Sequence, residues 1–108
     1  MQTPLSKPAA EQAEWRSHRR LDIAVSVEAS FEGIKQIARL TEVSANGARL
    51  MLGCLPQIGD LVILRKGSIE LSGSVAWTRA GAVGVRFDRP LPESEFVALR
   101  RAGLSLPR

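Results

Sequence analysis

The segment Ile69–Phe87, which reads IELSGSVAWTRAGAVGVRF, decides the fold class. Its first half alternates between polar residues and an apolar set made up of Ile69, Leu71, Val75 and Trp77. The dipeptide Ala80-Gly81 is typical of a turn, and the second half alternates again from Val83 to Phe87. Two runs of period two around a short turn predict an antiparallel β-hairpin.

The same pattern extends towards the N-terminus. Asn46-Gly47 is the strongest turn signal of the chain, because this dipeptide readily takes positive φ. Leu61–Arg65 is almost entirely apolar, and we expect it to be buried on both faces. Short turns separate six strands, which we expect at residues 21–29, 34–43, 48–52, 61–65, 69–78 and 83–87. This spacing predicts an all-β protein with a six-stranded antiparallel barrel.

The C-terminal part predicts a helix over residues 93–103. Pro92 precedes it, acidic residues occupy its first turn, arginines occupy its last turn, and Gly103 closes it. Phe96 and Leu99 fall on one face, so we expect the helix to plug one end of the barrel. We therefore predict one domain over residues 15–103, with a flexible N-terminal tail at 1–14 and a C-terminal tail at 104–108.

Composition and charge narrow the class of protein. The chain has 108 residues, 44% of them hydrophobic, with one cysteine and no apolar run long enough to cross a bilayer. No signal-like segment begins the sequence, so we expect a cytoplasmic protein without membrane insertion. Fifteen basic residues, twelve of them arginine, face eleven acidic ones. Arginine grips phosphates with a planar pair of donors, so the balance favours an anionic partner.

Catalytic signals are weak. His18 is the only histidine and Cys54 the only cysteine, and neither has a sequence partner for a triad or a metal site. No glycine-rich phosphate loop is present. We expect no enzyme activity, no metal and no cofactor.

Two local clusters carry a more specific signal. Trp15-Arg16-Ser17-His18-Arg19-Arg20 precedes the first strand, and Glu42-Val43-Ser44-Ala45-Asn46-Gly47 follows the second. Together they resemble the paired motifs of the bacterial PilZ family, Arg-x-x-x-Arg followed by Asp/Asn-x-Ser-x-x-Gly. Glu42 departs from that pattern. The strands Gly73–Trp77 and Gly84–Phe87 also resemble the Gly-x-Val-x-Trp and Gly-Val-x-Phe strands of the family.

The resemblance implies a PilZ-type barrel that binds the second messenger cyclic di-GMP. This ligand carries two phosphates and two guanines. Arg16, Arg19 and Arg20 are then expected to fold over the barrel mouth and to grip phosphates or pair with and stack on guanine. Trp77 is a further candidate for contact with a base. Ordering of the arginine segment would signal to a separate downstream protein.

The second motif supplies the other expected contacts. The Ser44 hydroxyl would donate to a phosphate or a base, and Gly47 would shape the turn and let the ligand approach. Glu42 would accept from guanine N1–H and N2–H, as aspartate does in the family, but through a side chain one methylene longer.

Each assignment has a structural alternative. Ser44–Gly47 also fits a simple hairpin turn, the arginines a solvated linker, and Trp77 a core residue beside Val75. At the level of function, Glu42 keeps open a degenerate PilZ protein that binds no nucleotide and acts as a protein-interaction adaptor. A basic barrel that binds single-stranded nucleic acid ranks third, because aromatic stacking platforms are few.

Overall fold

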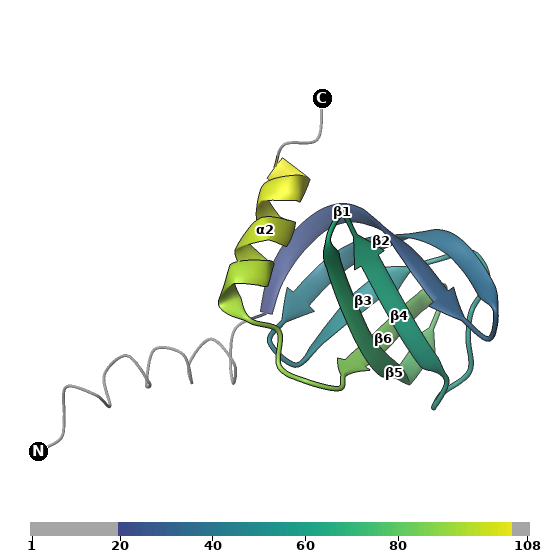
Figure 1. Cartoon of the computed structure of the whole chain (residues 1–108). Coiled ribbons are helices and arrows are strands. Elements are labelled where there is room, and N and C mark those ends of the chain that lie inside the picture. The colour runs from purple at the N-terminus through teal and green to yellow at the C-terminus, as the bar shows by residue number, and fades with distance from the viewer. Residues whose placement is uncertain (1–19, 105–108) are drawn as a thin grey trace, which may run out of the picture.

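A computed structural model describes residues 20–104. Within these residues, six antiparallel strands close into a barrel in the order β1-β2-β3-β6-β5-β4, and one helix, α2, follows them (Figure 1). The elements are β1 (Arg20–Phe31), β2 (Ile34–Ser44), β3 (Gly47–Met51), β4 (Leu61–Lys66), β5 (Ile69–Arg79), β6 (Ala82–Phe87) and α2 (Glu93–Leu104). The predicted fold class is confirmed. The tails predicted at 1–14 and 104–108 lie outside the described residues, apart from Leu104 at the end of α2.

Two tight hairpins fix the register of the barrel. Glu32 and Gly33 join β1 to β2 with φ of 51° and 75°, and Ala80 and Gly81 join β5 to β6 with φ of 51° and 84°. Positive φ at both central residues matches the twist of a two-residue turn to that of the flanking strands. The Ala80-Gly81 turn predicted from the sequence is confirmed.

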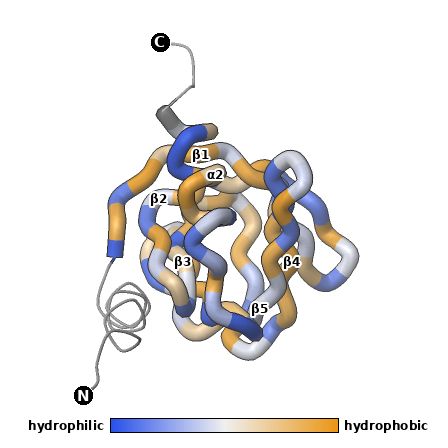
Figure 2. Tube along the Cα trace, turned by 60° about the vertical axis from the view of Figure 1, so that its left-hand side comes forward, coloured by the Kyte–Doolittle hydropathy of each residue, from blue (hydrophilic) through white to orange (hydrophobic). Residues whose placement is uncertain are grey.

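The core occupies the barrel interior and is closed at one end by α2. Hydrophobic and hydrophilic residues alternate along the strands (Figure 2), as expected for strands with one buried face. Phe96 and Leu99 of α2 are 5% and 1% exposed and belong to the same core cluster as Val27, Leu40 and Leu64. The helix therefore plugs the barrel as predicted. Within residues 20–104 no helix is long and apolar enough to span a membrane.

Gly103 has a different role from the predicted one. It lies inside α2, which continues to Leu104, and its φ is not in the left-handed region. A Cβ built there would lie 2.8 Å from Val25 Cγ2 and 3.1 Å from the Ala24 carbonyl oxygen. The missing side chain therefore lets the last turn of the helix lie directly on β1.

Strand β4 is not buried on both faces, so that prediction was wrong. Val62 and Leu64 face the core, whereas Leu61 is 72% exposed and Ile63 is half-buried. The reason is that α2 packs against β1 and leaves the outer face of β4 uncovered by the other described elements.

Candidate functional site

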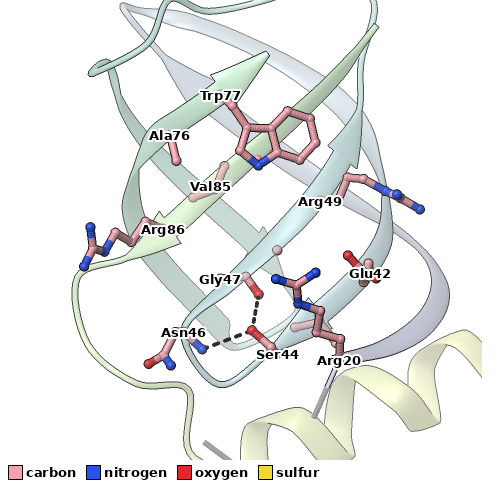
Figure 3. A pocket seen from close by; sticks show the side chains of 13 residues that line it. Arg20, Glu42, Ser44, Asn46, Gly47, Arg49, Ala76, Trp77, Val85 and Arg86 are labelled. Atoms are coloured by element: carbon pink, nitrogen blue, oxygen red, sulfur yellow. Dashed lines mark hydrogen bonds between the residues drawn. The ribbon is translucent and has the colours of Figure 1, made fainter. Parts of the chain in front are cut away.

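A pocket of about 370 Å³ lies on the outer wall of the barrel, over β2, β3, β6 and β5, with Arg20 at the start of β1 beside it (Figure 3). On β3, Arg49 precedes buried Leu50, and on β6, Gly84 and Arg86 alternate with buried Val83 and Val85. Positions 49, 84 and 86 therefore face outwards. The pocket is lined by Arg20, Glu42, Val43, Ser44, Asn46, Gly47, Ala48, Arg49, Ala76, Trp77, Gly84, Val85 and Arg86.

The pocket gathers most of the candidate residues named from the sequence. Five of them line it: Arg20, Glu42, Ser44, Gly47 and Trp77. Arg16 and Arg19 lie outside the described residues. The expected folding of the arginine segment over the barrel mouth therefore stays a prediction, and the pocket that gathers the five residues lies on the outer wall of the barrel.

Trp77 reaches this wall through a β-bulge. Val75 pairs with Val85, but Trp77 pairs with Gly84, so β5 has one extra residue, Ala76, at this point. An uninterrupted alternation would have put Trp77 on the core side with Val75. The bulge turns it outwards, and the side chain is 40% exposed. The interpretation of Trp77 as a core residue was therefore wrong, because the side chain lies on the outer wall and lines the pocket.

Glu42 reaches the same wall through a second bulge. Leu40 pairs with buried Leu50, and Glu42 pairs with Arg49, which leaves Thr41 as the extra residue of β2. If β2 and β3 paired without a bulge, Thr41 would pair with Arg49 and Glu42 with Ala48, whose side chain packs against the core. The bulge thus places the Glu42 carboxylate on the outer face, in the pocket lining, where it avoids the free-energy cost of burying a charge in the core.

The turn between β2 and β3 is held by its own serine. Asn46 N–H donates to Ser44 Oγ at 3.3 Å, and the Ser44 hydroxyl donates to the Gly47 carbonyl oxygen at 3.4 Å. Neither Asn46 nor Gly47 has positive φ, contrary to expectation. Gly47 is needed for another reason: a Cβ there would overlap the Val85 carbonyl oxygen of the neighbouring strand β6. The serine therefore both builds the turn and faces the pocket.

Arg49 and Arg86 also line the pocket, and sequence reasoning missed both. The Arg49 Nε–H donates to Thr41 Oγ1 at 3.0 Å, while the Thr41 hydroxyl donates to the Arg49 carbonyl oxygen at 3.2 Å. Only the alternation of side chains along the strands could have pointed to them. Arg49 is next to the apolar Leu50, and Arg86 lies between Val85 and Phe87, so both arginines are expected to face outwards.

The pocket is cationic. Its lining holds three arginines, Arg20, Arg49 and Arg86, against one carboxylate, that of Glu42. The indole of Trp77 adds a flat apolar surface. A lining that includes three arginines and an aromatic side chain suits an anionic, planar ligand such as a nucleotide. Within residues 20–104 no group of three metal-ligating side chains comes together.

A second pocket of about 390 Å³ lies between β5, β6 and the start of α2. Its ionisable lining residues are Glu70, Asp88, Glu95 and Arg89. Carboxylates prevail there, so it does not suit a phosphate-bearing ligand.

Comparison with known proteins identifies the family. The PilZ domain family matches residues 14–102, and the chain belongs to this family. A search of curated proteins finds no match. Among solved structures, the fold is similar to the Borreliella burgdorferi PlzA protein in complex with c-di-GMP, with a TM-score of 0.62 and 18% identity over 91% of this chain and 44% of PlzA.

The Bacillus subtilis inhibitor of motility, MotI/DgrA, is a second structure with a similar fold. Its TM-score is 0.52, with 16% identity over 82% of this chain and 49% of that protein. The chain thus spans about half the length of the solved proteins that it matches.

Proposed function

We propose that this PilZ domain binds cyclic di-GMP in the pocket on its outer wall and acts as a receptor in second-messenger signalling. The observation that carries the proposal is the gathering of Arg20, Glu42, Ser44 and Gly47, from both family motifs, around one cationic pocket. The ligand in the PlzA structure is in keeping with this assignment.

The chemistry of the pocket supports the same ligand. Cyclic di-GMP presents two phosphates and two guanines. The guanidinium of Arg20 can hold a phosphate with two parallel hydrogen bonds, and Trp77 offers its exposed indole to a base. Gly47 has no side chain at the point where β3 pairs with β6, so the ligand can approach the Ser44 hydroxyl.

The signalling step in this proposal is the ordering of Arg16–Arg20 over the bound ligand. Arg20 is the first residue of β1 and pairs with Ser44 on β2, so β1 begins beside the pocket. Two bound phosphates would draw Arg16 and Arg19 onto the wall. The ligand and the ordered segment together would form a surface that a separate protein recognises.

Calorimetric titration tests the function. We expect cyclic di-GMP to bind more than about tenfold tighter than GTP or GMP, because only the cyclic dinucleotide presents two linked guanines and phosphates. Short oligonucleotides serve as a further control. Equal affinity for all guanine nucleotides would leave only a basic patch, and no binding at all would favour the nucleotide-free adaptor.

A further inference from the structure

Arg49 and Glu42 lie next to each other on the pocket wall. They are cross-strand partners on β3 and β2, and both line the pocket. One side chain offers hydrogen-bond donors and the other offers acceptors, on the same side of the pocket (Figure 3). This is the complement of the Watson–Crick edge of guanine, where the O6 acceptor adjoins the N1–H and N2–H donors.

We propose that Arg49 is a specificity-determining residue that reads guanine together with Glu42, and that Thr41 positions it. This inference rests on the proposed function. Arg49 donates to guanine O6 while Glu42 accepts from N1–H and N2–H. Adenine presents an N6 donor where guanine has O6 and an N1 acceptor where guanine has N1–H, so both residues would meet the wrong partner.

The geometry around Arg49 supports a fixed reading position. Thr41 Oγ1 takes the Nε–H of Arg49 at 3.0 Å, which leaves the two terminal amino groups of the guanidinium for a ligand. The Thr41 hydroxyl is itself held by the Arg49 carbonyl oxygen at 3.2 Å. The Arg49 side chain is thus held by one hydrogen bond to a threonine that is itself anchored to the backbone of β3. A side chain restrained in this way loses less freedom when it binds, and this favours selective recognition.

The bulge in β2 connects all three residues. Thr41 is the extra residue, and because of it Glu42 lies opposite Arg49 on the outer wall. The same local feature therefore supplies the acceptor for Arg49 Nε–H and aligns the carboxylate beside it. A family motif residue and a residue outside the motif thus act as one recognition unit.

Selectivity between two cyclic dinucleotides tests this inference. Cyclic di-AMP carries the same phosphates as cyclic di-GMP but a different base edge. We expect Arg49→Ala to lower the affinity for cyclic di-GMP by about tenfold or more while cyclic di-AMP binding stays within about twofold. Arg49→Lys keeps the charge but not the fork, so it should also lose selectivity. Thr41→Val should reduce the preference for guanine to a smaller extent.

Arg39→Ala is the matched control, because Arg39 is an exposed arginine of β2 that does not line the pocket. It should leave both affinities unchanged. Equal weakening of both dinucleotides by Arg49→Ala, or no change, would overturn the inference and leave the proposed function standing. If the parent protein binds neither dinucleotide, the proposed function itself fails. Circular dichroism of each variant separates lost recognition from lost folding.

Discussion

Trp77 lies so close over Gly84 that no side chain fits at position 84. A Cβ built on Gly84 would overlap Nε1 and Cε2 of the indole and would lie 2.7 Å from Cδ1. Gly84 is buried although it points outwards, because the indole covers it. The glycine and the bulge at Ala76 together determine where the aromatic floor of the pocket lies.

Gly84→Ala should therefore displace the indole. We expect a loss of about 1–3 kcal/mol in the free energy of unfolding, measured with denaturant, because the added methyl group meets a rigid ring and paired backbone. In a Trp15→Phe background the remaining tryptophan emission should also shift. Gly53→Ala is the control, since nothing lies within 4 Å of a Cβ there and its φ is not positive. Equal stability of both variants would mean that the indole has room to move.

Arg20→Ala should weaken cyclic di-GMP binding without unfolding the barrel. Arg20 is exposed at the start of β1, so we expect little effect on stability. The loss of a charge-assisted pair of hydrogen bonds should cost about 2–4 kcal/mol, or about 30- to 1,000-fold in affinity, measured by calorimetry. Arg20→Lys should recover only part, and added salt should weaken both. If Arg20→Ala and Ser44→Ala each bind within about twofold of the parent, the motif is a remnant.

A charge-removing substitution at Glu42 tests whether its carboxylate accepts hydrogen bonds from guanine or repels the phosphates. Glu42→Gln keeps the length of the side chain and removes the charge. If the carboxylate accepts from guanine, the affinity for cyclic di-GMP should fall by about tenfold, whereas relief of repulsion from the phosphates would raise it. Glu42→Asp restores the family residue and should bind as well as the parent or better. Titrations at one fixed salt concentration compare the three proteins.

Amide exchange tests the proposed signalling step. With saturating cyclic di-GMP we expect slower exchange at residues 16–20, because ordering at an interface protects backbone amides. The turn at Gly33 belongs to a hairpin that does not line the pocket and serves as the internal reference. Unchanged exchange at 16–20 despite full occupancy would show that this segment does not carry the signal.

The sequence predicted strands, turns and the helix well because these depend on local periodicity. The prediction that Phe96 and Leu99 close the barrel needed only the spacing of apolar residues on one helix face, and both are buried. The hairpin turn at Ala80 and Gly81 was also predicted correctly, and both residues have positive φ.

The predictions were wrong where a bulge interrupts the alternation of inward and outward residues along a strand. They were also wrong where a neighbouring strand or helix determines how a residue is packed. The alternation along β5 placed Trp77 in the core. The extra residue of the bulge instead turns its side chain outwards, and nothing in the amino-acid composition marks such a bulge. Gly47 was assigned to turn geometry, whereas its actual constraint is the carbonyl oxygen of Val85, nearly forty residues away in sequence. Arg49 was overlooked because it belongs to no motif and becomes relevant only when β3 lies between β2 and β6.

Closure of the barrel restricts how another protein can recognise this domain. Every strand has a neighbour on each side, and the shortest seam consists of the three residue pairs between β1 and β4. An incoming chain therefore finds no full-length strand edge within residues 20–104 to which it could add by main-chain pairing. A partner that recognises the barrel within residues 20–104 would then contact side chains and bound ligand, which change with ligand occupancy, rather than a free strand edge that is always present.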